Sequence, residues 1–210
     1  MPFNLAVRRY VLGTVAAACG VLWVTSALGG PKPDLWALFS LFFVGCLLEV
    51  SRTQHKSGGL TGSLVFVFHL AVGLILGGFW GALTAGVVKA VSQVYERVPL
   101  MKASFNVAER VVSVGLTFVV YRLLGGHHPP AFLDPSTAGT VPFDVALGEV
   151  GVFLLAALVY FVVNSVAVNI VVALASERPI VSTWRANTVW VRGYDLAASS
   201  LAIVVTWCCH

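Results

Sequence analysis

Long apolar segments without a charged side chain limit what this chain can fold into more than any other feature. The first runs from Tyr10 to Leu28. In lipid, every backbone polar group must be paired internally, so only helices and closed barrels can span the bilayer. A barrel would show short alternating strands, whereas these continuous runs approach the ~20 residues a helix needs to cross the hydrocarbon. The pattern predicts an all-α, polytopic integral membrane helical bundle.

Composition excludes two other classes of protein. The chain has 210 residues, of which 58% are hydrophobic and 10% charged, with a mean hydropathy of +0.90. Soluble domains are about 25% charged, so a water-soluble enzyme does not fit. Disordered chains are poor in apolar residues, so disorder does not fit either. The formal net charge of +4 is better explained by basic cytoplasmic loops than by nucleic acid, and we expect no nucleic-acid partner.

We expect six to seven transmembrane helices in a single domain, 1–210. The apolar run at the N-terminus continues beyond Cys19 and is longer than a signal-peptide core, so we interpret it as an uncleaved first span. The third and fourth spans are joined by a glycine-rich turn at Gly77–Gly81. Six spans is the alternative if the last segment is re-entrant. The expected spans lie near 10–28, 35–50, 58–78, 79–95, 105–124, 145–175 and 194–210.

Basic residues predict the orientation, because cytoplasmic loops collect Lys and Arg. With the N-terminus cytoplasmic, only Lys32 and Arg122 lie near span ends on the outer side. We therefore predict a multi-pass membrane protein whose N-terminus is cytoplasmic. The bases on the cytoplasmic side would be Arg8, Arg9, Arg52, Lys56, Arg97, Lys102, Arg178, Arg185 and Arg192.

Small residues recur every four positions in the expected hairpin. Gly73, Gly77 and Gly81 follow this spacing, and Ala82 with Gly86 continues it. Such residues let helix backbones approach closely in lipid. We interpret them mainly as packing positions, with a glycine-lined ligand path as the alternative.

Ionisable residues at membrane depth are expensive and are candidate functional residues. The hairpin places His69 and Lys89 at similar depth, and the nearest acids are Glu49 and Glu109. One interpretation is a polar ligand-binding site. The other is structural: an ion pair of Lys89 with Glu109, and a neutral His69 bonded to a backbone carbonyl or hydroxyl group.

Buried amides extend this candidate cavity. Asn106, Glu109 and Arg110 form a polar face at the start of the fifth span, at spacings i, i+3 and i+4. Asn164 and Asn169 lie deep in the sixth span. They could line a cavity or bond neighbouring helices. The candidate ligand-site residues are thus His69, Lys89, Asn106, Glu109, Asn164 and Asn169.

Signatures of enzymes and metal sites are missing from the sequence. It contains no HExxH, GxSxG or Walker motif. His127-His128 lacks a suitably spaced third ligand, and Cys208-Cys209-His210 has no partner motif elsewhere. We therefore expect no catalytic residues, no metal and no cofactor, and we expect that the chain is not an enzyme.

One block of the sequence resembles a known family. Phe105-Asn106-Val107-Ala108-Glu109-Arg110, continued by Val111 to Leu116 and closing with Tyr121-Arg122-Leu123-Leu124-Gly125-Gly126, is similar to the N-terminal integral-membrane region of HD-GYP and GGDEF proteins. Those are bacterial cyclic-di-GMP signalling proteins. The resemblance implies a membrane sensory or anchoring module with a cytoplasmic output domain, and the motifs of such a domain do not occur in this chain. A looser likeness in size and texture is to the substrate-binding subunits of energy-coupling-factor transporters.

The sequence leaves three functions open. The first is a bacterial inner-membrane sensory or anchoring module that lacks its output domain in this chain. The second is a small-solute subunit that binds or transports a vitamin or metal ion, with His69, Lys89, Glu109 and Asn164 in its pocket. The third is a non-catalytic accessory subunit of a membrane complex. The expected partners are the lipid bilayer, a small-molecule ligand, and a second copy or a complex partner.

Overall fold

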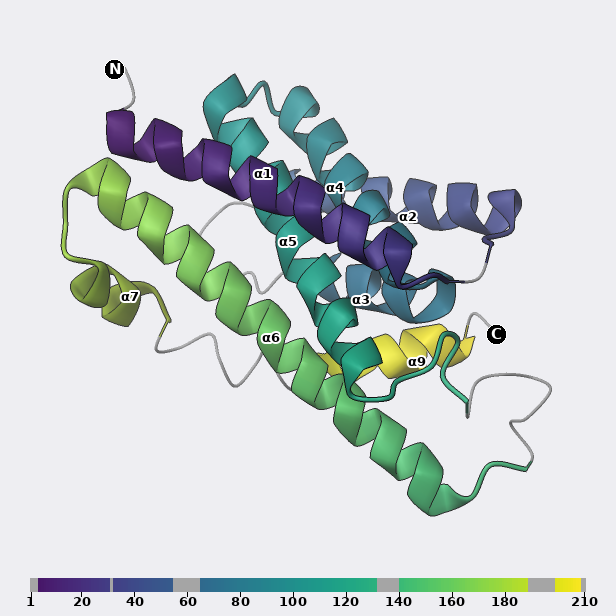
Figure 1. Cartoon of the computed structure of the whole chain (residues 1–210). Helices are drawn as coiled ribbons and strands as arrows, with labels where there is room; N and C mark the ends of the chain where they lie inside the picture. The colour runs from purple at the N-terminus through teal and green to yellow at the C-terminus, as the bar shows by residue number, and fades with distance from the viewer. Residues whose placement is uncertain (1–3, 31, 55–64, 132–139, 189–198, 209–210) are drawn as a thin grey trace.

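Helices form all the regular structure in the part of the chain that the structure describes. The computed structural model describes residues 4–30, 32–54, 65–131, 140–188 and 199–208. Figure 1 shows the helices in chain order. They are α1 (Leu5–Ala27), α2 (Leu35–Gln54), α3 (Val65–Leu76), α4 (Gly78–Tyr95), α5 (Leu100–Leu123), α6 (Phe143–Ser176), α7 (Ile180–Thr188) and α9 (Leu201–Cys208).

Helix α5 is the centre of the bundle. It packs against α1, α4 and α6, three helices that lie around it in Figure 1. Helix α4 also contacts α2 and α3, while α7 packs on α6. The main apolar core follows α5 through Val114, Phe118 and Tyr121, which are all at most 1% exposed. This arrangement surrounds the middle and second half of α5 with other helices.

Helix α3 is enclosed rather than peripheral. It contacts α2, α4, α5 and α9, and every residue from Val65 to Leu76 except Ile75 is buried. Its twelve residues extend only ~18 Å at 1.5 Å per residue. The apolar character of α3 therefore comes from contacts with other helices, not with lipid.

The α3–α4 hairpin turns at one residue. Gly77 has φ +87°, and α4 begins directly after it at Gly78. Side chains other than glycine are strained in this backbone region. The turn is thus tighter than the Gly77–Gly81 stretch expected from the sequence, because Gly81 already lies within the first turns of α4.

Fewer helices qualify as membrane spans than the six to seven expected. Among the described residues, α1, α5 and α6 are long and apolar enough to cross a membrane. The apolar part of α2 ends at Ser51, and α3 is shorter still. Lys89, Ser92 and Gln93 make α4 more polar. Helix α9 covers eight residues, and most of the expected span before it (194–198) lies outside the described residues.

Large apolar side chains cover the outside of the bundle. Trp36, Phe39 and Phe43 on α2 are each more than 60% exposed, and Trp23 on α1 is 74% exposed. In the most apolar 18-residue stretch of α6, only 28% of the residues are buried within the protein. Monomeric soluble proteins rarely expose contiguous apolar surface on this scale. These faces are suited to contact with lipid, in agreement with the membrane character of the sequence.

Candidate functional site

A buried ion pair connects α2 and α4. The Lys89 ammonium donates a 2.6 Å hydrogen bond to Glu49 Oε1, and the two side chains are 7% and 1% exposed. From the sequence, Glu49 and Glu109 were both candidate acids for Lys89, and the structural interpretation paired Lys89 with Glu109. That choice was wrong, because α4 packs on α2 in a way that brings Lys89 to Glu49.

His69 is in the same region, and it makes no hydrogen bond to the described part of the chain. Its side chain is fully buried on α3, and neither ring nitrogen has a partner among the described residues. Glu49, Lys89 and Arg110 are all close enough to act electrostatically on the ring. An imidazole buried in this way costs free energy unless it bonds to water, an ion or another polar group.

Helix α5 adds a second pair of charges to the same region. Glu109 is 4% exposed and accepts a 2.7 Å hydrogen bond from the Ser113 hydroxyl. Arg110 donates from Nη1 to the hydroxyl group of Tyr160 on α6, and its guanidinium lies 5.9 Å from the centre of that ring. Helices α2 to α6 thus each contribute a polar side chain. We call Glu49, His69, Lys89, Glu109, Arg110 and Tyr160 the polar cluster.

The polar cluster carries balanced charge in a region of low dielectric. Two carboxylates, Glu49 and Glu109, face two permanent cations, Lys89 and Arg110. Coulombic interactions are much stronger here than in water, so adding or removing one charge alters the balance by several kcal/mol. The cluster can therefore respond to a proton or an ion.

The amides predicted to line the cavity lie in different places. Asn106 donates a 2.6 Å hydrogen bond to Gln93 Oε1 and so links α5 to α4. Asn169 donates to the Ser165 carbonyl of its own helix, at 2.7 Å. Asn164 is half-buried on α6. The structure thus brings His69, Lys89 and Glu109 into one region, whereas Asn169 makes its described bonds within α6.

The glycines lie where helices approach most closely. A Cβ atom on Gly81 would be 2.6 Å from the Gly73 Cα, so these two residues form the α3–α4 contact. A Cβ on Gly73 would also overlap the Phe118 ring of α5, and one on Gly86 would overlap Val111. Gly77 forms the turn. These positions leave no room for a ligand path between the helices.

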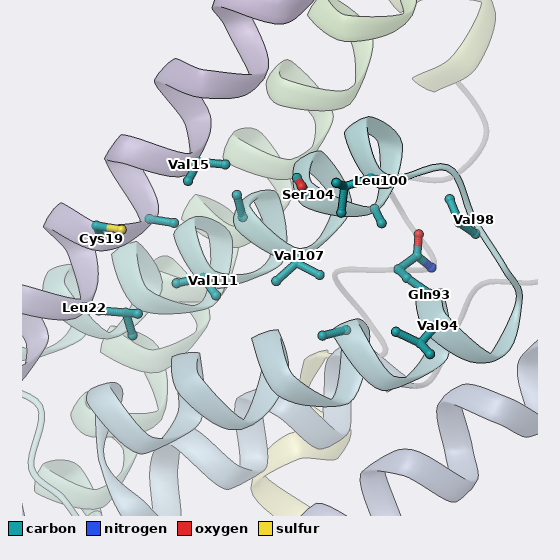
Figure 2. Close-up of a pocket in the computed structure, with 14 residues that line it drawn as sticks. Val15, Cys19, Leu22, Gln93, Val94, Val98, Leu100, Ser104, Val107 and Val111 are labelled. Carbon is teal, nitrogen blue, oxygen red and sulfur yellow. The ribbon is translucent and has the colours of Figure 1, made fainter.

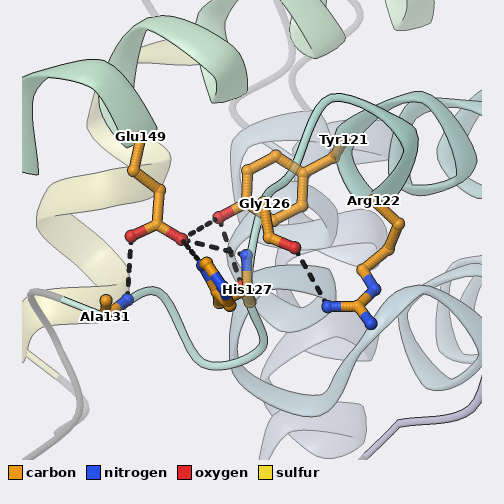
Figure 3. A network of polar contacts seen from close by, with 6 residues as sticks. All are labelled: Tyr121, Arg122, Gly126, His127, Ala131 and Glu149. Atoms are coloured by element: carbon orange, nitrogen blue, oxygen red, sulfur yellow. Dashed lines mark hydrogen bonds and ion pairs between the residues drawn. The ribbon is translucent and has the colours of Figure 1, made fainter. Parts of the chain in front are cut away.

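A second polar network, which was not predicted from the sequence, connects the segment after α5 to α6. Glu149 on α6 accepts hydrogen bonds at Oε1 from the Tyr121 hydroxyl (3.1 Å) and the His127 backbone N–H (2.9 Å). Its Oε2 accepts from the Ala131 N–H at 2.8 Å. Figure 3 shows this carboxylate between α6 and the loop. One side chain thus anchors the loop to α6.

His128 lies next to this network and packs between aromatic rings. Its ring centre is 5.5 Å from that of Phe118 and 5.2 Å from that of Tyr121. Burial, followed by the nearby Arg122 charge, lowers the pKa of His128 to about 4. This histidine is therefore neutral at physiological pH. The described residues contain no group of three His, Cys, Asp or Glu side chains that could hold a metal ion.

A hollow of about 520 Å³ lies elsewhere, between α1, α4 and α5. Figure 2 shows its labelled side chains pointing into the space between these helices. None of the candidate ligand-site residues lines it. Its walls are almost entirely apolar, with Gln93 and Ser104 as the polar exceptions. The sequence contains no motif that could have revealed it.

Comparison with known proteins identifies the family. The family model named MASE9, which describes a membrane-associated sensory domain, matches residues 35–208. No curated protein and no solved structure matches the chain. The match covers most of the chain and includes α2 to α9, with all six residues of the polar cluster. The chain belongs to the MASE9 family of membrane-associated sensory domains.

Proposed function

We propose that the chain is the membrane sensory module of a bacterial signalling protein, with the polar cluster as the element that responds to the signal. Membership of a sensory family supports the first part. The observation that carries the second part is the convergence of charges from α2, α4 and α5 on His69, whose ring nitrogens have no partner among the described residues. A buried imidazole that finds no hydrogen-bond partner in the described part of the chain costs a purely structural bundle free energy.

The response follows from electrostatics at low dielectric. A proton or ion that reaches the polar cluster changes the balance between the Glu49–Lys89 pair and the Glu109–Arg110 charges. Because these groups belong to separate helices, the new balance favours a different packing of α2, α4 and α5. Two packings of one bundle that differ by a few kcal/mol suffice for a switch.

The output in this proposal is a cytoplasmic domain that makes or degrades cyclic di-GMP. The resemblance of the block 105–126 to membrane regions of HD-GYP and GGDEF proteins supports this assignment. The basic residues support an N-terminus on the same, cytoplasmic side of a multi-pass bundle in the inner membrane. Fusions of an alkaline phosphatase and a fluorescent protein after Gly30, Arg97 and Gly126 test the topology, because each reporter works on one side only.

The signalling proposal is tested in the native bacterium with His69→Phe, a change that removes the imidazole without creating a cavity. Cellular cyclic di-GMP is measured with a fluorescent reporter in the wild type, a deletion strain and the variant, after equal membrane levels are verified by immunoblot. We expect the deletion to change the nucleotide level and His69→Phe to hold it at one value in growth media of low, intermediate and high salt. His128→Phe is the matched control.

Two results would contradict the proposal. If deletion leaves cyclic di-GMP unchanged in all three media, the assignment of the output is wrong. If the deletion has an effect but His69→Phe behaves like the wild type and like His128→Phe, the polar cluster is not the responsive element.

A further inference from the structure

The hollow between α1, α4 and α5 is a groove made by small side chains. Ala18 and Cys19 on α1, Ala90 on α4, and Ala103 and Ala108 on α5 line it where larger residues would have closed it. At about 520 Å³ it falls within the ~300–1,000 Å³ range of small-molecule pockets. We call this feature the α1–α4–α5 groove.

The groove covers the depth of one leaflet. Along α5 its lining extends from Leu100 to Val111, a distance of ~17 Å at 1.5 Å per residue. Half of the ~30 Å hydrocarbon core is ~15 Å. The groove starts at the α4–α5 turn, where Val98 lines it, and ends at Val111 near the middle of α5, with Leu22 of α1 also in its lining. An acyl chain lying along it would extend from the membrane interface to the bilayer centre.

Positive charge surrounds the end of the groove at the turn. Arg97 and Lys102, both exposed, flank the lining residues Val98 and Leu100, and the turn contains one carboxylate, Glu96. The start of α1 lies at the same end, since the Tyr10 and Phe105 rings are 6.0 Å apart. Basic side chains at this depth attract anionic lipid headgroups.

We propose that the α1–α4–α5 groove binds one acyl chain of an anionic phospholipid, with the phosphate group at Arg97 and Lys102. The apolar walls exclude a polar solute, and the surrounding medium at this depth is itself made of acyl chains. The charge at one end selects the headgroup. This inference is independent of the output domain and of the polar cluster.

The bound chain would support the α4–α5 contact. Gln93 lines the groove and accepts the hydrogen bond from Asn106, which lies one turn before Glu109 of the polar cluster. A filled groove keeps water away from this amide pair. The lipid therefore acts as a structural component of the sensory bundle.

Native mass spectrometry of the purified protein tests the proposal with dioleoyl phosphatidylglycerol and dioleoyl phosphatidylcholine as probes. We expect the wild type to prefer the anionic lipid. Arg97→Gln and Lys102→Gln should each weaken that preference about 5-fold, the effect of one base near the membrane surface. Lys32→Gln, which removes a charge from the α1–α2 connection, is the matched control and should have no effect.

If larger side chains occupy the groove, the protein should lose lipid binding whatever the headgroup. Ala90→Leu and Ser104→Leu enlarge half-buried lining residues, and together they should reduce phosphatidylglycerol binding at least 10-fold. Val91→Leu, on the exposed face of α4, is the control. Thermal unfolding of each variant verifies that it is folded.

The wild type provides a measurement that does not depend on the folding of a variant. Cys19 is exposed and lines the groove, whereas Cys46 lies on α2. Phosphatidylglycerol should slow modification of Cys19 by N-ethylmaleimide several-fold and leave Cys46 unchanged, as measured by peptide mass spectrometry. Equal binding of both lipids, unaltered binding in the filled variant, or no protection of Cys19 would each overturn the proposal. The proposal would also be overturned if the wild type were a dimer and the Ala90→Leu/Ser104→Leu variant a monomer, because the groove would then be an interface between copies.

Discussion

The Glu49–Lys89 pair offers the most direct test of how the bundle is stabilised. Replacing Lys89 by Met keeps the length and volume of the side chain but removes its charge. The Glu49 carboxylate then remains buried, 1% exposed, without the ammonium that lies 2.6 Å from it. Removing one member of a buried ion pair is strongly destabilising because the other charge stays buried, whereas two apolar residues in place of a pair are often neutral.

The expected magnitude follows from this burial. Removing one member of a buried ion pair costs about 3–5 kcal/mol. In a protein of about this size, 1 kcal/mol changes Tm by about 2–4 °C, so Lys89→Met should lower Tm by about 6–20 °C. The double variant Glu49→Leu/Lys89→Met should recover most of this loss. Lys102→Met removes an exposed lysine of α5 and should change Tm by no more than about 2 °C.

The assay is thermal unfolding in mild detergent, followed by circular dichroism at constant protein and detergent concentration. The double-mutant cycle gives the coupling between the two residues. If Lys89→Met unfolds within about 2 °C of the wild type, the pair is hydrated and the burial argument is wrong. If the double variant is as unstable as the single one, the loss comes from packing and not from charge.

Four further outcomes are expected from the same unfolding assay or from hydrogen exchange. His69→Phe should raise Tm, because it removes two buried nitrogens that lack partners among the described residues; a fall of several degrees would show that the ring is bonded. Gly81→Ala should cost about 1–3 kcal/mol by separating α4 from Gly73, and an unchanged Tm would mean that the hairpin packs more loosely. Glu149→Ala should speed amide exchange at residues 127 and 131, whose N–H groups the carboxylate binds, and unaltered exchange would contradict the anchoring role. The pKa of His128 is depressed to about 4 from 6.5 in the folded state, so stability should fall as pH decreases from 6.5 to 4, when the unfolded chain binds the extra proton; His128→Phe should remove that part of the pH dependence.

The helices could be predicted from the sequence because long apolar runs mark them and polar segments separate them. The expected spans 105–124 and 145–175 correspond to α5 and α6 within five residues at each end. The number of spans could not be predicted in the same way. An apolar segment such as α3 has the same composition whether lipid or protein surrounds it, so hydropathy counted it as a span. Helix α7 lies in a segment expected to be an inner loop.

The polar cluster was only partly predictable for a similar reason. Hairpin geometry indicated that His69 and Lys89 lie at similar depth, since both are at comparable distances from the turn. The choice between Glu49 and Glu109 depends on which helix faces Lys89, and this is set by tertiary packing. The residues directly before and after Tyr160 in α6 are apolar, so nothing in the sequence pointed to its contact with Arg110.

Helix α6 has a mechanical consequence that follows from its length. Its 34 residues form a rod of ~51 Å, whereas the hydrocarbon core is ~30 Å thick. It is joined near one end to the loop through Glu149, near its middle to Arg110 through Tyr160, and at the other end to α7. A tilt of about 5° around one end moves the other by about 4 Å over this length. Because Tyr160 lies near the middle of the rod, a displacement beside it is about doubled at the far end.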